Sequence, residues 1–221
     1  MIQYLDIIKT LIFPALLETI YMVFFSGLFS IVIGILLGII LYVTHKGGIM
    51  ENYYLNKILS CIVNLGRSIP FVILIIVVFP LSRFIVGTSI GSTAAIVPLT
   101  IASIPFVARL VEGNLQDVDK GIIEASISLG ATNLQIITKV LIPESMHNIV
   151  HTITITLINI IGYSAMAGLV GGGGLGDVAN RYGAQRYRID VLIITIIAFV
   201  ILVQFIQILG SFISNKLNKR L

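Results

Sequence analysis

Long apolar segments dominate this sequence and constrain its fold more than any other feature. Between Thr19 and His45 the chain carries no Asp, Glu, Lys or Arg, and a helix that crosses a bilayer needs about 20 mostly apolar residues. Hydrophobic residues make up 57% of the 221 residues and charged residues 11%, whereas soluble domains average about 25% charged residues. The composition therefore indicates an integral membrane protein, and the length suits a single membrane domain over residues 1–221.

Five apolar segments are predicted to cross the membrane as helices, so the expected fold is an all-α, polytopic membrane protein. They cover residues 19–43, 58–82, 88–111, 147–170 and 190–213. The residues before the first segment, MIQYLDIIKTLIF, are expected to form a short interfacial helix that ends near Pro14. Proline is expected to end it because its ring lacks an amide hydrogen and is disfavoured inside a helix.

Positive charges at the ends of these segments predict the orientation of the chain. Five spans place the two termini on opposite sides, with eight Lys and Arg residues on the side of the C-terminus and five on the other side, when Arg67 is left out. Because Lys and Arg are enriched in cytoplasmic loops, the N-terminus is predicted to lie outside and the C-terminus in the cytoplasm. The same count places residues 117–143, between the third and fourth spans, on the cytoplasmic side.

This cytoplasmic segment is predicted to form two short helices. Asp119 suits the positive end of the first helix, which Gly130 can close in a left-handed conformation. Thr132, with Gln135 three residues later, forms a capping-box pattern that begins the second helix. Pro143 is expected to end it, because the residue before a proline is disfavoured in the helical conformation.

Each of the two short helices is expected to have an apolar face. Ile122, Ser126 and Leu129 share one face of the first helix, and Ile137 and Leu141 share one face of the second. These faces are expected to lie against the membrane-spanning helices and to leave a polar face toward the cytosol. An ordinary amphipathic loop would have the same pattern, so the spacing alone does not assign a function.

The letters EASISLGATNLQIITKVLIP, residues 124–143, resemble the EAA loop of bacterial ABC importer permeases. The pattern of that family is Glu-Ala-Ala, three residues, Gly, nine residues and Ile-x-Leu-Pro, and the departures from it are small or aliphatic: Ser126, Val140 and Ile142. The resemblance implies a coupling helix that docks into a cleft of a separate cytoplasmic ATPase. The docking residues that it implies are Glu124, Ala125, Ser126, Gly130, Ala131 and Pro143.

Three further stretches resemble the permease of methionine-type ABC importers: GRSIPFVIL (66–74), VGTSIG (86–91) and GYSAMAGLVGGGGLGDVANRYG (162–183). The resemblance implies a homodimer of five-span subunits in the bacterial cell membrane. It also implies two cytoplasmic ATPase subunits, an extracytoplasmic substrate-binding lipoprotein and methionine or a related amino acid as the substrate. The chain itself is expected to hold no cofactor and to catalyse no reaction.

Other kinds of transporter and membrane protein remain as alternatives. An ABC importer permease for another small substrate would share the same motifs. A secondary transporter usually carries ionisable residues within its spans, and no Asp or Glu lies in the interior of the predicted spans. A structural membrane protein would not need the EAA pattern. A nucleic-acid-binding protein would cluster its basic residues on one face, whereas these are scattered over loop ends.

Several local patterns suggest enzyme or cofactor chemistry but lack the required context. The segment GGGGLG contains G-x-G-x-x-G, which binds dinucleotides only between a strand and a helix; here it follows an apolar helix and is expected to form a flexible outer loop that rearranges during gating. Glu144, His147 and His151 have helical spacing for a metal, but contacts with headgroups or neighbouring helices are the favoured interpretation. Ser164 stands roughly 20 Å along a helix from His151, so no catalytic residue and no metal site are expected.

A gate is predicted in the fourth span, where small side chains let helix backbones approach closely. Met166 lies within this run and has a flexible thioether, which suits filling a closed pore and then swinging aside. We expect Tyr163, Ser164 and Met166 to line the gate at a dimer axis, with simple helix packing as the alternative. Arg67, well inside the second span, is a candidate functional residue because charges within spans are rare. A structural role, in which it reaches the cytoplasmic interface or bonds carbonyls freed near Pro70, is the favoured interpretation.

Overall fold

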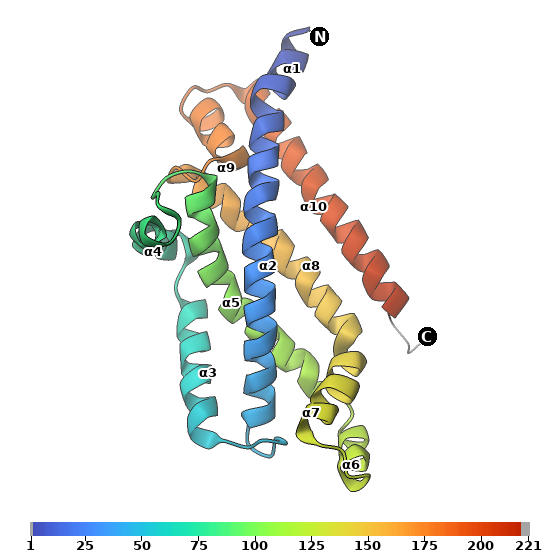
Figure 1. Cartoon of the computed structure of the whole chain (residues 1–221). Coiled ribbons are helices and arrows are strands. Elements are labelled where there is room, and N and C mark those ends of the chain that lie inside the picture. The colour runs from blue at the N-terminus through green and yellow to red at the C-terminus, as the bar shows by residue number, and fades with distance from the viewer. Residues whose placement is uncertain (1, 218–221) are drawn as a thin grey trace.

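The computed structural model describes residues 2–217, with side-chain surroundings from Leu5 onward, and every regular element in this range is a helix. Four helices are long and apolar enough to cross a membrane, and a bent helix pair raises the number to five if that pair counts as one span. The prediction of an all-α polytopic protein is therefore confirmed. Figure 1 shows the long helices side by side, with short helices at both ends of the bundle.

The chain begins with a continuous helical segment that passes through Pro14. It consists of α1 (Ile2–Ile7), a π-helical turn η1 (Ile8–Ile12) and α2 (Phe13–Thr44). The prediction that a separate interfacial helix ends near Pro14 is wrong. The reason is the π turn, in which the amide of Phe13 donates to the carbonyl oxygen of Ile8, because such a local widening accommodates a proline without ending the helix.

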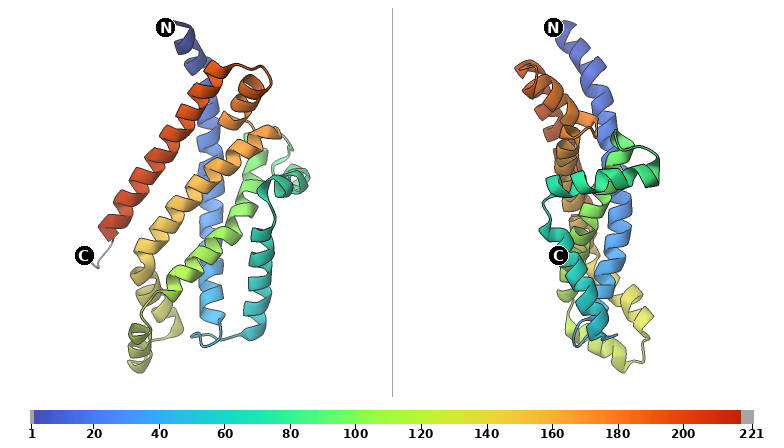
Figure 2. Two further views of the ribbon diagram at one scale, coloured as in Figure 1. Left: turned by 180° about the vertical axis from the view of Figure 1, so that it is seen from behind. Right: turned by 90° about the vertical axis from the view of Figure 1, so that its left-hand side faces the viewer.

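The second predicted span is helical but broken in its middle. Helices α3 (Tyr53–Ser68) and α4 (Phe71–Val86) are bent by 106° relative to each other, so the predicted span over 58–82 is a broken helix pair rather than one continuous helix. The break falls at Ile69, which has an extended backbone (φ −83°, ψ 121°), because the residue before a proline is disfavoured in the helical region. Helix α4 consequently lies across the bundle, as the right-hand view of Figure 2 shows.

The remaining long helices are α5 (Ser92–Gln116), α8 (Ile142–Leu169) and α10 (Ile189–Leu217). Helix α8 continues without a break from α7 (Asn133–Ile136) and a π turn η2 (Ile137–Leu141). The prediction that Pro143 ends the second short helix is therefore wrong, for the same reason as at Pro14: a π turn directly precedes the proline. Residues 133–169 form one helical rod.

Helices α2 and α5 pack closely because glycines remove side chains from their contact. A Cβ atom built on Gly34 would lie 2.5 Å from Cβ of Val107, and one on Gly38 would lie 2.7 Å from the carbonyl oxygen of Ala108. Such small residues drive helix association in membranes, where van der Waals packing replaces the hydrophobic effect. The α2–α5 pair therefore forms the centre against which α3, α4 and α8 pack.

The short elements gather at opposite ends of the bundle. Helix α6 (Lys120–Ser128), α7 and the turn between α2 and α3 lie at one end. The N-terminus, the segment between α4 and α5, and helix α9 (Gly174–Val178) with the π turn η3 (Ala179–Ala184) lie at the other end. The two sets of short elements are thus separated by the length of the long helices.

Substitution of Gly34 by alanine tests the close approach of α2 and α5. We expect Gly34→Ala to lower stability by about 1–3 kcal/mol, because the added methyl overpacks the contact with Val107. Gly113→Ala on α5 is the matched control: nothing lies within 4 Å of its Cβ position, and the exchange favours the helix by about 1 kcal/mol. Thermal unfolding in detergent measures both, and equal effects of the two substitutions would contradict the packing account.

Candidate functional site

The end of the bundle that holds α6 and α7 contains the residues of the EAA-like pattern. The side chain of Asp119 caps α6 by accepting a hydrogen bond from the amide of Gly121 at 2.7 Å. Gly130 follows α6 with φ 80°, and the amide of Ala131 bonds back to the carbonyl oxygen of Ser126 at 3.1 Å. The predicted left-handed helix end at Gly130 is confirmed, and it turns the chain sharply toward α7.

Helix α7 begins with the predicted capping box. The amide of Gln135 donates to Oγ1 of Thr132 at 3.3 Å, and the amide of Thr132 donates to Oε1 of Gln135 at 2.9 Å. These reciprocal bonds satisfy amides that a helix start leaves without partners. Together with the turn at Gly130, they give the α6–α7 unit a defined shape.

The buried face of this unit differs from the predicted one. Ile123 is buried on α6, whereas Ile122 is exposed and Leu129 is 87% exposed; the prediction that Ile122 and Leu129 face the membrane helices is wrong. Ile123 instead joins Val118, Ile136 and Leu141 in one apolar cluster that also contains Leu115 of α5, because packing against residues distant along the chain sets the rotation of α6. The predicted contact of Leu141 with the bundle is confirmed.

An exposed apolar surface results from this arrangement. We define the coupling surface as the exposed aliphatic residues of the segment from α6 to α7, which are Ile122, Ile127, Leu129 and Leu134. Leu134 is 70% exposed. Ile122 and Ile127 lie on α6, Leu129 follows it, and Leu134 lies in the first turn of the rod from Asn133 to Leu169. Exposed apolar side chains that gather at one place are typical of interaction sites.

The six residues implied by the resemblance all lie at this end, in different environments. Glu124, Ala125, Gly130 and Pro143 are exposed. Ser126 is half-buried and donates from Oγ to the carbonyl oxygen of Ile122 at 2.7 Å. Ala131 is half-buried and packs against the apolar cluster around Ile123.

At the opposite end, the glycine-rich segment is tied to α2. The amide of Gly174 donates to Oε2 of Glu18 at 2.7 Å, and the amide of Leu175 donates to Oγ1 of Thr19 at 2.9 Å. The amide of Gly91 also donates to the carbonyl oxygen of Gly171 at 2.8 Å. The segment runs from just after α8 into the first residues of α9 and does not follow a strand, so it lacks the context of a dinucleotide site.

Glu18 and Thr19 are functional candidates that the sequence reasoning missed. One signal was present, since Glu18 is the last charged residue before a long uncharged run. Their partners lie 156 residues away in the sequence, which no local pattern reveals. Nearby, the side chain of Arg181 pairs with Asp177, and this hydrogen bond raises the pKa of Arg181 above its ordinary value.

The three residues predicted for the gate face different surroundings. The ring of Tyr163 stacks on Phe71 of α4, with centroids 4.5 Å apart and planes inclined by 13°. Ser164 is 1% exposed and donates to the carbonyl oxygen of Ile161 at 2.7 Å. Met166 is 41% exposed, so among the three only this side chain offers a large surface to a partner.

The other candidates have structural surroundings. Nδ1 of His147 lies 2.9 Å from both the carbonyl oxygen and Oγ of Ser214 on α10, while His151 and Glu144 are exposed. Within residues 2–217 no group of three His, Cys, Asp or Glu side chains is placed to hold a metal. Arg67 is exposed in the last turn of α3.

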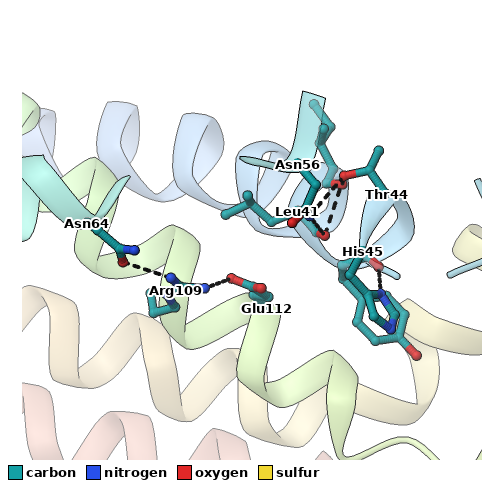
Figure 3. Close-up of polar contacts among 9 residues, drawn as sticks. Leu41, Thr44, His45, Asn56, Asn64, Arg109 and Glu112 are labelled. Atoms are coloured by element: carbon teal, nitrogen blue, oxygen red, sulfur yellow. Dashed lines mark hydrogen bonds and ion pairs between the residues drawn. The ribbon is translucent and has the colours of Figure 1, made fainter. Parts of the chain in front are cut away.

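A polar network links α3 to its neighbours and was also missed. The guanidinium of Arg109 donates to Glu112 at 2.6 Å and to Oδ1 of Asn64 on α3 at 2.7 Å, as Figure 3 shows. Glu112 is buried. The network satisfies a buried carboxylate, which would otherwise be costly, and it fastens the C-terminal half of α3 to α5.

The sequence of this chain matches a known protein family and is similar to named relatives. Residues 31–221 match the family described as "Binding-protein-dependent transport system inner membrane component". The chain is 49% identical over 218 residues to a probable D-methionine transport system permease protein MetI of Vibrio cholerae, covering 99% of this chain and 97% of the relative. It is 46% identical over 181 residues to the methionine import system permease protein MetP of Bacillus subtilis, covering 82% of both.

Solved structures agree with this result. A crystal form of the inward facing MetNI methionine ABC transporter superimposes with a TM-score of 0.94 at 47% identity, covering 96% of this chain and 98% of that chain. The crystal structure of an amino acid ABC transporter with histidines superimposes with a TM-score of 0.76 at 21% identity. At that lower identity, the likeness concerns the fold alone.

The bond between Thr19 and Leu175 leads to a prediction about the outer segment. Thr19→Val is expected to cost about 1–3 kcal/mol, because it leaves the buried amide of Leu175 without an acceptor. Thr195→Val is the matched control: both threonines are buried and bond a carbonyl of their own helix, but among residues 5–217 no backbone amide donates to Thr195. Thermal unfolding and amide hydrogen exchange at Leu175 measure the effect, and an equally large loss with Thr195→Val would refute this role.

Proposed function

Because the chain belongs to the family of binding-protein-dependent transport system inner membrane components, we propose that it is the permease subunit of an ATP-driven importer for methionine or closely related amino acids. Relatives named as D-methionine or methionine permeases align with most or all of the chain. ATP hydrolysis belongs to a separate ATPase subunit. The permease supplies the pathway through the membrane by alternating access.

The exposed coupling surface is the main support for the proposal that this end of the bundle docks to the ATPase. Two capped helices present four exposed aliphatic side chains at the end of the bundle, with Leu129 the most exposed of them. Their burial in a cleft of the ATPase would remove this apolar area from water. Glu124 and Ala125 belong to the same exposed helix, and Gly130 sets the angle between the two helices.

The α6–α7 unit, called the coupling unit from here on, is joined to the pathway by a continuous helix, which transmits its movement. The rod from Asn133 to Leu169 begins beside the coupling surface and contains Tyr163, Ser164 and Met166 near its far end. A helix transmits a push along its axis because its backbone hydrogen bonds and packed neighbours resist bending. Closure of the ATPase subunits upon ATP binding therefore tilts this rod from an inward-facing to an outward-facing arrangement.

The two ends of the bundle have different partners in this proposal. The coupling unit lies in the cytoplasm of a bacterial cell, so the opposite end, with the N-terminus and α9, faces outward and receives substrate from an extracytoplasmic binding lipoprotein. Most Lys and Arg residues lie on the cytoplasmic side in this orientation, as the distribution of positive charge in membrane proteins requires. A second copy of the chain completes the pathway.

A permease for another small substrate is the alternative that the fold leaves open. The specificity then belongs to the binding protein, while the coupling surface and the rod keep their roles. ATP hydrolysis by the reconstituted complex distinguishes the two possibilities. Stimulation by methionine supports the proposal, and stimulation by another amino acid but not by methionine contradicts the proposed substrate.

Substitution of Gly130 tests the docking role. Gly130→Asp is expected to abolish co-purification of the ATPase, because a side chain at φ 80° strains the turn that sets the coupling helices. Glu124→Lys is expected to weaken the association by reversing an exposed charge on the docking helix.

Gly87→Asp is the matched control for Gly130→Asp. Gly87 has a φ of 81° and nothing within 4 Å of its Cβ position, as at Gly130, but it lies at the opposite end of the bundle. The ATPase should stay bound to this variant. Retention of the ATPase by both Gly130→Asp and Glu124→Lys would exclude the docking assignment.

Substitution of Met166 tests the gate. Met166→Ala is expected to raise ATP hydrolysis in the absence of substrate or to let substrate leak, without loss of assembly, because a short side chain no longer fills the closed pathway. The half-buried Met146 on the same rod provides the control variant Met146→Ala. If neither basal hydrolysis nor leak changes with Met166→Ala, the side chain packs helices and does not form the gate.

A further inference from the structure

The turn between α2 and α3, residues 45–52, is held rigidly beside the coupling unit. The amide of Met50 donates to the carbonyl oxygen of Val43 at 2.9 Å, and the amide of Asn52 donates to the carbonyl oxygen of Thr44 at 3.0 Å. Nδ2 of Asn56 reaches back from α3 to the carbonyl oxygen of Leu41 at 2.7 Å and to Oγ1 of Thr44 at 3.2 Å. Figure 3 shows how these bonds close the turn onto the end of α2.

The tip of the turn is also well defined. The His45 ring lies against the ring of Tyr42, with centroids 5.2 Å apart. The amide of Gly47 donates to Oε2 of Glu51 at 3.0 Å, and Gly48 has no room for a Cβ because it would lie 2.5 Å from the carbonyl oxygen of Val43. Lys46 stands exposed at this tip.

A hollow of about 400 Å³ separates the turn from α6. Its walls carry Lys46 from the turn and Lys120 and Glu124 from α6, while Tyr42 and Ile123 contribute to its lining. None of the three charged side chains takes part in an ion pair among residues 5–217. The hollow therefore offers two cationic groups and one anionic group that are free to interact with a partner.

We propose that the α2–α3 turn is a second docking element for the ATPase, and that an acidic side chain of the ATPase enters the hollow and pairs with Lys46 and Lys120. The inference rests on the proposed function, because it identifies the partner of this surface as the subunit that binds the coupling surface. Continuity supports it: Ile127 belongs to the coupling surface and also lines the hollow. A protein that covers Ile127 thus reaches the entrance of the hollow.

The charges of the hollow determine the chemistry of the partner. Lys46 and Lys120 face Glu124 on the walls, and Glu51 lies at the tip of the turn, where its carboxylate accepts from the amide of Gly47. The two lysine ammonium groups are the donors with which a carboxylate of the partner pairs. A preformed turn adds affinity because little conformational freedom is lost on binding. The ATPase surface is accordingly expected to have an apolar cleft for the coupling surface with an acidic side chain at its rim.

Charge reversal tests this inference. Lys46→Glu is expected to weaken binding of the purified ATPase to the detergent-solubilised permease by roughly tenfold and to reduce the salt dependence of binding. Lys120→Glu on the opposite wall should act in the same direction, and Lys46→Gln should have a smaller effect. Lys57→Glu is the matched control: Lys57 is exposed on α3 beside Tyr53 and does not line the hollow. The Lys57→Glu variant should bind the ATPase with the same affinity as the wild type.

Two outcomes would overturn the inference. In the first, Lys46→Glu binds the ATPase as tightly as Lys57→Glu does. In the second, Lys46→Glu is defective only in nanodiscs that contain anionic phospholipid and is normal in detergent or neutral nanodiscs, which would assign the hollow to a lipid headgroup. Gly130→Asp, measured in parallel, separates this failure from that of the proposed function: loss of binding with Gly130→Asp but not with Lys46→Glu removes only the second docking element.

Discussion

The close contact between α2 and α5 is the interaction on which the rest of this fold depends. Gly34 and Gly38 bring the two backbones together, and a bilayer offers no hydrophobic effect between helices that could replace such packing. The polar network of Arg109 then fastens α3 to this pair, and Glu18 and Thr19 of α2 hold the glycine-rich segment. Both candidate sites are therefore positioned by helices that pack on the same pair.

A second constraint is that backbone groups inside a membrane must find partners within the protein. A proline removes one backbone donor from a helix, and the chain accommodates Pro14, Pro143 and Pro70 in two ways, while Pro80, Pro98 and Pro105 lie inside α4 and α5. Pro14 and Pro143 each follow a π turn and the helix continues, whereas Ile69 before Pro70 takes an extended conformation and the helix breaks by 106°. The first solution lengthens the rod that begins at the coupling unit, and the second lays α4 across the bundle.

The sequence predicts where the helices lie better than it predicts which of them join into one continuous helix. Length and hydropathy identify the helical segments, and local chemistry identifies the turn at Gly130 and the capping box at Thr132, because these depend only on neighbouring residues. The π turns were missed because no residue pattern distinguishes them from an ordinary turn of helix. The rotation of α6, which buries Ile123 and exposes Leu129, depends on packing against residues distant along the chain, as do the bonds of Glu18 and Thr19.

The position of the glycine-rich segment limits how the rod can move. Gly168 of α8 and Gly176 of α9 leave no room for a Cβ because each meets the backbone of the other helix, so α8 and α9 are packed backbone to backbone. The start of α9 is bonded at the same time to Glu18 and Thr19 of α2. A tilt of the rod relative to α2 must therefore either carry α2 with it or break these two bonds. Loss of the bond to Thr19 leaves the buried amide of Leu175 without an acceptor, which costs about 1–3 kcal/mol.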